Sequence, residues 1–415
     1  MLERIYRKIK KFDNIYIFGA GKVGKAILEQ FMIIYPDIKI KAIIVSDLKN
    51  NPLYIYGIPV FEINSINFCK DTVVVLAVYE KHIKEIIEKL TKAECDNIVK
   101  VNSIDLDDWE TAKEEYECLP EKFLCSQRYV QPYINTLIDL ERIKGSDNDK
   151  IQESIENKIN DLYNKKKLDI ARLVITLGSK CSLRCKECNN LIPNFVPQRD
   201  YDYEKILSSI ERLVSLASSV LKCELIGGEP FLTDNLYKIL PYLINQSKIH
   251  SIEITTNGTI IPRRSYISLL QNPKVRIRIS DYGTIVNQVE FISFCKKNHM
   301  NYTVLELGKW ISPGGVNKRN KNIKDLKREY GKCSSGYLCK TLHENKLFSC
   351  SRSASLYELG YMIEKEYVSI DEDTTIDMLK SFFTQGYSFA CDYCDLQVKN
   401  RKYVDPAIQI SKINT

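Results

Sequence analysis

Three cysteines in one short loop constrain this chain more than any other feature of its sequence. They are Cys181, Cys185 and Cys188, in C-x3-C-x2-C spacing, and they follow an apolar run. A structural zinc site normally has four cysteine or histidine ligands, whereas a [4Fe–4S] cluster held by three cysteines leaves one iron open. Because no fourth cysteine or histidine is close by, the spacing favours a cluster with an open iron. A zinc knuckle, or cysteines grouped by chance, is the alternative.

Two further motifs follow at the ends of later apolar runs. The first is Gly227-Gly228-Glu229-Pro230, and the second is Thr256-Asn257-Gly258-Thr259. A fourth apolar run ends at Ser280 and Asp281. With the cysteine loop, this ordered series resembles the radical SAM superfamily over about half of the chain.

The resemblance implies a set of cofactor contacts. Cys181, Cys185 and Cys188 would ligate a [4Fe–4S] cluster, and its open iron would bind S-adenosylmethionine (SAM), which an electron cleaves to a 5′-deoxyadenosyl radical. The residues that would contact SAM are Gly227, Gly228, Glu229, Pro230, Thr256, Asn257 and Ser280. Glycine suits a backbone that approaches a ligand closely. One position departs from the family, because Glu187 stands where an aromatic residue usually lies against the adenine.

Alternating apolar and amphipathic segments predict an α/β fold from residue 171 onward. We expect strands at 173–177, 223–227, 251–256, 275–281 and 302–308, separated by helices at 203–221, 235–246, 264–271 and 287–298. Such a series predicts a parallel sheet, and the resemblance implies a partial (β/α)6 barrel over residues 171–325. The motifs then fall at the carboxyl ends of strands, where barrel enzymes place their active sites.

The first hundred residues carry a second glycine motif. Residues 14–18 read as a strand and lead into Gly19-x-Gly21-x-x-Gly24 and an amphipathic helix, and Asp47 follows the next apolar run. This order predicts a Rossmann-like domain over residues 1–104. The glycines are explained either by a bound nucleotide or by close packing of helix on strand. The segment is similar to small modules attached to enzymes of bacterial surface-polysaccharide and nucleotide-sugar assembly.

Residues 105–170 change character and are interpreted as a helical connector. Ile151, Ile155, Ile159 and Leu162 repeat at helical spacing through a charged segment that stops near Lys167.

A second group of cysteines lies in the last hundred residues. Its members are Cys333, Cys339, Cys350, Cys391 and Cys394. The segment between Cys339 and Cys350 alternates as a hairpin would, and Cys391-x-x-Cys394 supplies a close pair, so four sulfurs could hold zinc or an iron–sulfur cluster. The pattern resembles the shortened auxiliary-cluster domain, related to the longer SPASM domain, that follows many radical SAM barrels.

This second resemblance implies one further [4Fe–4S] cluster in a domain over residues 326–415. Its expected ligands are Cys339, Cys350, Cys391 and Cys394. Cys333 is then the spare cysteine, which replaces one of these ligands, donates a hydrogen atom, or simply packs. The hairpin usually carries a glycine where this chain has Asn345, and asparagine also tolerates left-handed backbone.

Composition excludes several classes of protein. The 415 residues carry a formal net charge of +7 with dispersed acidic residues, so the lysine runs are typical of solvated faces and a nucleic-acid partner is not expected. Fourteen cysteines without a targeting signal indicate metal or redox chemistry in the cytoplasm. No apolar run approaches the length of a membrane span.

The expected function is that of a radical SAM enzyme. It would abstract hydrogen from a carbon of a saccharide, polyol or nucleotide-sugar, and either dehydrogenate or epimerise it. An electron donor such as flavodoxin or ferredoxin is implied. Peptide or protein modification is the alternative within the superfamily, and an inert, metal-stabilised binding protein is the alternative outside it.

Overall fold

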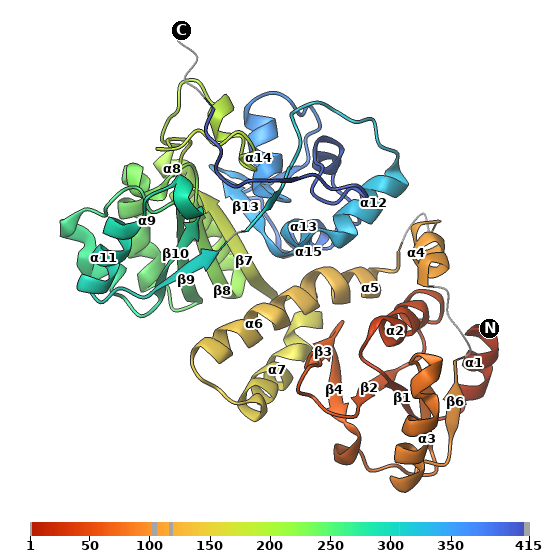
Figure 1. Ribbon diagram of the computed structural model, residues 1–415. Coiled ribbons are helices and arrows are strands. Elements are labelled where there is room, and N and C mark those ends of the chain that lie inside the picture. Colours follow the sequence, from red (N-terminus) through yellow and green to blue (C-terminus); the bar gives the residue numbers. More distant parts are fainter. Residues whose placement is uncertain (1, 102–105, 116–118, 307, 411–415) are drawn as a thin grey trace. The chain divides into compact units, whose positions relative to one another are not determined.

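The computed structural model describes residues 2–101, 106–115, 119–306 and 308–410 (Figure 1). It is a mixed α/β structure with parallel sheets, which confirms the predicted class. The chain divides into two compact units. One consists of Met1–Ile134 with Asp147–Ile159, and the other of Asn135–Ser146 with Asn160–Thr415. The four domain boundaries expected from the sequence stay a prediction.

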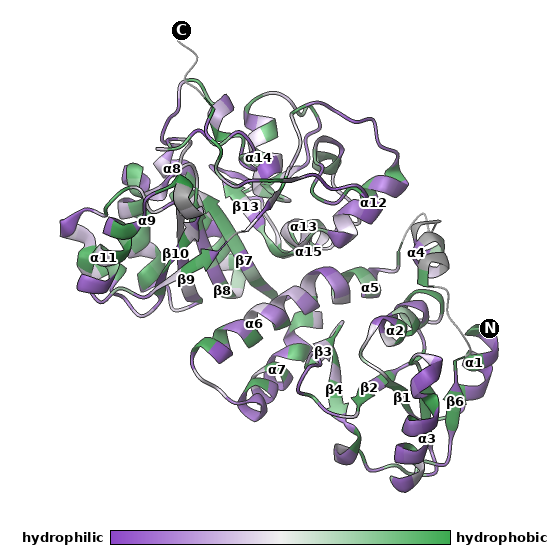
Figure 2. Cartoon of the chain, viewed as in Figure 1, coloured by the Kyte–Doolittle hydropathy of each residue, from purple (hydrophilic) through white to green (hydrophobic). Residues whose placement is uncertain are grey.

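The first unit is built on a six-stranded sheet of order β3-β4-β2-β1-β5-β6. All neighbours pair in parallel except β3 and β4, which form a hairpin. Its strands are β1 (Asn14–Phe18), β2 (Ile40–Val45), β3 (Tyr54–Ile55), β4 (Ile58–Glu62), β5 (Thr72–Leu76) and β6 (Ile98–Lys100). These strands are mostly apolar in Figure 2, as expected for a sheet covered on both faces.

Helices of the first unit are α1 (Leu2–Ile9), α2 (Lys22–Ile34), α3 (Ile83–Lys92), α4 (Leu106–Glu115) and α5 (Glu121–Cys125). A π-helical turn at Ser126–Val130 leads into α6 (Gln131–Ile143), most of which belongs to the second unit, and α7 (Asn148–Tyr163) belongs mostly to the first. The helical periodicity predicted for the connector is confirmed in α7, where Ile151, Ile155 and Leu162 are buried.

The second unit is built on an eight-stranded sheet of order β11-β10-β9-β8-β7-β13-β14-β15 (Figure 1). Strands β7 to β11 pair in parallel, and β13 joins the free edge of β7 in parallel before the direction reverses at β14. The strands are β7 (Leu168–Thr176), β8 (Ala217–Ile226), β9 (Ile249–Thr256), β10 (Val275–Asp281), β11 (Tyr302–Glu306), β13 (Lys340–His343), β14 (Lys346–Phe348) and β15 (Tyr367–Ser369).

Helices α8 (Tyr203–Leu216), α9 (Asp234–Asn245), α10 (Ile267–Leu270) and α11 (Val289–Lys297) connect the parallel strands. The predicted helix over residues 203–221 was therefore too long. The residues after Leu216 pair with the start of β7, at Leu168 and Asp169, so the strand continues where helical periodicity suggested a helix. Pairing with β7 therefore determines the structure of these residues, although their local sequence pattern favours a helix.

The last hundred residues extend this sheet from the edge of β7. The predicted hairpin is confirmed as β13 and β14, in which Thr341 opposes Phe348. Its left-handed residue is Glu344, with φ of 50°, rather than Asn345. The remaining elements are β12 (Trp310–Ile311), α12 (Ile323–Lys332), α13 (Ser334–Leu338), α14 (Ser351–Glu358), α15 (Ile376–Phe383) and β16 (Tyr403–Val404). Over the described part of the chain, no helix combines the length and apolarity that crossing a bilayer requires.

Candidate functional site

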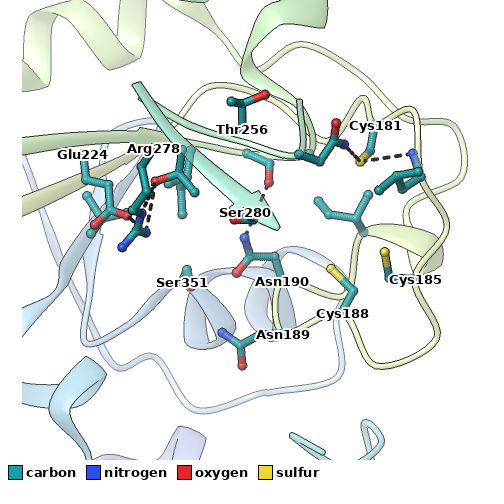
Figure 3. A pocket seen from close by; sticks show the side chains of 18 of the residues that line it. Cys181, Cys185, Cys188, Asn189, Asn190, Glu224, Thr256, Arg278, Ser280 and Ser351 are labelled. Carbon is teal, nitrogen blue, oxygen red and sulfur yellow. Dashed lines mark hydrogen bonds and ion pairs between the residues drawn. The ribbon is translucent and has the colours of Figure 1, made fainter. Parts of the chain in front are cut away.

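A cavity of about 420 Å³ opens at the carboxyl ends of the parallel strands in the second unit, and we call it the main cavity. The three predicted motifs and the cysteine loop all contribute to its lining. Figure 3 labels Cys181, Cys185, Cys188, Thr256 and Ser280 among the lining residues. The lining residues predicted from the sequence are Cys181, Cys185, Cys188, Gly227, Gly228, Thr256, Asn257 and Ser280. Residues far apart in the sequence thus meet in one place, as expected for successive parallel strands.

Hydrogen bonds hold the cysteine loop to the strand ends. The amide of Cys181 donates to Oε1 of Gln198 at 3.2 Å, and Asn257 Nδ2 donates to Ser182 Oγ at 3.1 Å. Asn257 Nδ2 also lies 3.8 Å from the sulfur of Cys181. Burial raises the pKa of the Cys181 thiol to about 12, and the neighbouring thiols act in the same direction. A bound metal would have to displace these protons.

The two glycines of the second motif pack directly against the cysteine loop. The amide of Gly228 donates to the carbonyl of Gly178, and the amide of Glu229 to that of Lys180. A Cβ at Gly227 would collide with the Gly178 carbonyl, and one at Gly228 would overlap that of Lys180. These two positions therefore require glycine because the backbone of the cysteine loop lies close to them, whether or not a ligand also does.

Glu229 is buried and holds two motifs together. Its carboxylate accepts from the amide of Phe231 at 3.2 Å, the hydroxyl of Thr256 at 2.8 Å and the amide of Asn257 at 2.9 Å. Burial raises its pKa to about 7, although these donors oppose the change. Neither Glu229 nor Pro230 is among the residues that line the main cavity, and contact of these two residues with SAM stays a prediction.

Gln288 also connects two strand ends, and the sequence analysis did not identify this residue. Its Nε2 donates to the carbonyls of Asn257 and Ser280, both at 2.6 Å. It thereby fixes the ends of β9 and β10 to each other. A lone glutamine at the start of α11 carries no motif that would have identified it.

The aromatic surface beside the cysteine loop comes from another part of the chain. Glu187 accepts a hydrogen bond from the hydroxyl of Ser312 at 2.7 Å. Tyr282 and Trp310 line the main cavity, with ring centroids 5.6 Å apart in a T-shaped arrangement. Trp310 packs with Cys185 in one hydrophobic cluster.

A segment near the end of the chain lies across the cysteine loop. The amide of Lys186 donates to the carbonyl of Ile408 at 2.8 Å, and that of Ile410 to Arg184 at 2.9 Å. Gln409 accepts from the amide of Arg184, and its Nε2 lies 3.5 Å from the sulfur of Cys185. We call residues 407–410 the loop-covering segment.

The second cysteine group divides between two cavities. Cys333, Cys350, Cys391 and Cys394 line a small cavity of about 30 Å³. Cys339 lines the main cavity instead, where Arg172 Nη1 lies 3.6 Å from its sulfur. The structure thus pairs the supposed spare cysteine, Cys333, with the other three, which differs from the set expected from the sequence.

Arg352 lies between the two groups of cysteines. It is 2% exposed, and its guanidinium donates to the carbonyls of Asn189, Gly314, Gly315 and Tyr393. Its charge lowers the pKa of Cys188 and Cys394, against the larger effect of burial. A buried cation with carbonyl partners suits a site that accumulates thiolate charge.

Cysteine sulfurs dominate the potential ligand set at both cavities, and such donors suit an iron–sulfur cluster or zinc. Within the described residues, no three histidine, cysteine or acidic side chains are placed to hold a single metal ion. General acid or base residues are not identified by the arrangement.

The glycines of the first unit have a clear packing role. Gly19 has φ of 119°, and a Cβ at Gly24 would overlap the carbonyl of Gly19, so helix α2 approaches the turn closely. Gly21 precedes α2 and has open space around it. Asp47 follows β2 and caps its own turn through the amide of Lys49. Nucleotide binding at these residues stays a prediction.

Comparison with known proteins gives partial sequence matches. No family model matches the chain. It is 33% identical over 106 residues to the GTP 3′,8-cyclase of Syntrophomonas wolfei, covering 24% of this chain and 30% of that protein. It is 32% identical over 98 residues to the GTP 3′,8-cyclase of Synechocystis, covering 23% and 28%. The matches span less than a third of these relatives, and they support the radical SAM resemblance at the level of the superfamily.

Solved structures resemble the fold weakly. The enzyme anSMEcpe with bound AdoMet and a peptide is 14% identical, with a TM-score of 0.38 over 56% of this chain and 84% of that one. BtrN in complex with AdoMet and 2-DOIA is 14% identical, with a TM-score of 0.36 over 56% and 97%. SuiB of Streptococcus suis bound to S-adenosylmethionine is 13% identical, with a TM-score of 0.32 over 73% and 76%.

Proposed function

We propose that this chain is a radical SAM enzyme that abstracts hydrogen from a carbon of a saccharide, polyol or nucleotide-sugar. The observation that carries the proposal is the meeting of Cys181, Cys185 and Cys188 with the three strand-end motifs around one cavity. When bound there, a [4Fe–4S] cluster with one open iron supplies the electron that cleaves SAM and generates the hydrogen-abstracting radical.

The protein's own contribution is to position SAM and to exclude water. Thr256, Asn257 and Ser280 offer polar groups at the cavity, and Glu229 and Gln288 fix the backbone that carries them. We assign the adenine-facing surface to Trp310 and Tyr282, which replace the aromatic residue absent at Glu187. Rigid support of this kind keeps reacting atoms within the narrow range that radical transfer requires.

We propose a second [4Fe–4S] cluster on Cys333, Cys350, Cys391 and Cys394. Their shared cavity and the nearby charge of Arg352 support this assignment. A cluster there gives a substrate radical somewhere to send an electron, which favours two-electron dehydrogenation over epimerisation.

The test is anaerobic reconstitution with iron and sulfide, followed by reduction in the presence of SAM. We expect 5′-deoxyadenosine from the wild-type protein and none from Cys185→Ala. The buried Cys223→Ala, which removes a thiol outside both cavities, is the matched control and should retain cleavage. A wild-type protein that holds its full iron content and releases no 5′-deoxyadenosine would support the inert binding protein instead.

A further inference from the structure

The main cavity has a charged end that the proposed cluster and SAM contacts do not use. Arg172 on β7, Glu224 on β8, Thr255 on β9 and Arg278 on β10 line it. In Figure 3, Glu224 and Arg278 lie on the opposite side of the cavity from the three labelled cysteines. On each strand these residues come before the motif or the cysteine loop that follows the strand.

Two guanidinium groups share one carboxylate at this end. Arg278 Nη2 lies 2.5 Å from Glu224 Oε1, and Arg172 Nη1 lies 3.6 Å from Glu224 Oε2. Burial alone would raise the pKa of Glu224, but the charges of Arg278, Arg172 and Lys222 together lower it. Glu224 is therefore ionised, and it cannot neutralise both arginines.

The neighbouring charges do not remove this excess. Lys222 Nζ pairs with Glu253 Oε2 at 2.7 Å, and Arg278 Nε lies 3.4 Å from Glu253 Oε1. Glu253 is thus already shared between two cations. Arg172, Arg278 and Lys222 carry three positive charges. Glu224 and Glu253 carry two negative charges, so this end of the cavity retains a net positive charge.

Arg172 also has an unused donor. Its Nε is buried and has no hydrogen-bond partner among the described residues. A buried guanidinium normally fills its donor positions, and the planar fork suits a carboxylate or phosphate. Arg172 shares Glu224 with Arg278, and its other contact is the sulfur of Cys339 at 3.6 Å, so its guanidinium keeps donor capacity for a ligand.

We propose that Arg172 and Arg278 form a subsite for an oxyanion of the substrate, a carboxylate or a phosphate. The inference rests on the proposed function, since it places the anionic group at one end of the cavity and the reacting carbon nearer the cysteine loop. It narrows the substrate class to uronic acids, sugar phosphates and nucleotide-sugars. Neutral saccharides and polyols would leave the excess charge unpaired.

The test is anaerobic titration calorimetry of the reconstituted protein with SAM present. The probes are glucose, glucuronate and glucose 1-phosphate, which differ in their anionic group. We expect at least one anionic probe to bind about tenfold or more tightly than glucose, because a charged hydrogen bond is worth roughly that factor. Tighter binding of glucuronate alone identifies a carboxylate substrate, and tighter binding of glucose 1-phosphate alone a phosphorylated one.

Variants locate the effect. Arg172→Gln and Arg278→Gln should each lose the preference for the anion. Arg276→Gln removes the same charge from the same strand, outside the lining of the main cavity, and should keep it. The proposal is overturned if both anions bind the wild-type protein no better than glucose, or if Arg276→Gln abolishes the preference as fully as Arg278→Gln.

The anion subsite and the cleavage of SAM can be tested independently of each other. Release of 5′-deoxyadenosine without any preference for anions would overturn the subsite and leave the proposed function intact. An anion preference lost in Arg278→Gln, in a protein that never cleaves SAM, would uphold the subsite and overturn the enzyme.

Discussion

At the scale of single residues, the motif glycines are the most sharply constrained positions. A side chain at Gly228 has no room, because the Lys180 carbonyl occupies the space. The sequence predicted glycine here for the sake of a ligand, and only the structure shows the backbone of the cysteine loop against it.

Gly228→Ala should therefore displace the cysteine loop. We expect a loss of stability of about 2 kcal/mol or more and reduced iron content, since backbone rather than a flexible side chain must move. Gly315→Ala, where a Cβ meets nothing within 4 Å, is the control. Equal iron content and equal urea midpoints in the two variants would contradict the packing argument.

A cluster of charges around Glu358 makes stability depend on pH. Arg199 Nη2 lies 2.5 Å from Glu358 Oε1, and His343 Nε2 lies 3.4 Å from Oε2. The hydrogen bond to His343 and then the contacts with Arg199 lower the pKa of Glu358 to about 2, against the effect of burial. These contacts join α14 to the hairpin and to the segment after the cysteine loop.

Because the pKa of Glu358 is lower in the folded protein than in the unfolded chain, its contribution is present above about pH 4.5. It is lost as the pH falls from there toward 2. Glu358→Gln should cost about 1 kcal/mol at pH 7, a modest value because Arg199 is partly exposed. In anaerobic urea denaturation, the loss of stability in Glu358→Gln should be smaller at pH 4 than at pH 7. A larger loss at pH 4 would contradict the lowered pKa of Glu358.

At the scale of elements, the cysteine loop depends on a segment more than two hundred residues away. Local patterns located the loop, β7 and the motif-bearing strand ends correctly. They could not locate the loop-covering segment, because its pairing with Arg184 and Lys186 is set by the path of the whole chain. Gln288, Gln409 and Trp310 were missed for the same reason, since each acts through a long-range contact.

Gln409→Ala should make the proposed cluster harder to reduce. A donor to a ligating sulfur stabilises the more negative, reduced state, so its loss should shift the potential to a more negative value. A redox titration followed by EPR measures the shift. Gln397→Ala, which removes a half-buried glutamine that accepts a hydrogen bond from Arg401, serves as the control. An unchanged or more positive potential in Gln409→Ala would show that this contact does not tune the cluster.

At the scale of the whole molecule, the sequence correctly predicted a mixed α/β chain with parallel sheets. It did not predict that the cysteine hairpin would continue the sheet through β13 and β7. That continuity places Cys339 beside the main cavity while Cys333 joins the other three cysteines. The hairpin pattern and the resemblance to the auxiliary-cluster domain favoured Cys339 as a ligand, because Cys339 lies next to the hairpin in sequence.

The partition of the cysteines predicts different losses of iron. Cys333→Ala should lose about four irons per chain, as Cys391→Ala should, because each removes one ligand of the second cluster. Both should retain some cleavage of SAM without product. Cys339→Ala should keep its iron, and iron and sulfide analysis distinguishes the variants. Loss of iron in Cys339→Ala with full retention in Cys333→Ala would restore the ligand set expected from the sequence.

The central claim is that three thiols hold a cubane whose fourth iron binds SAM. The most direct measurement is the EPR spectrum of the reduced, reconstituted protein with and without SAM. We predict a [4Fe–4S] signal whose g values change when SAM is added. A spectrum that does not change when SAM is added, or a protein that takes up zinc and no iron, would contradict a SAM-binding cluster on these three cysteines.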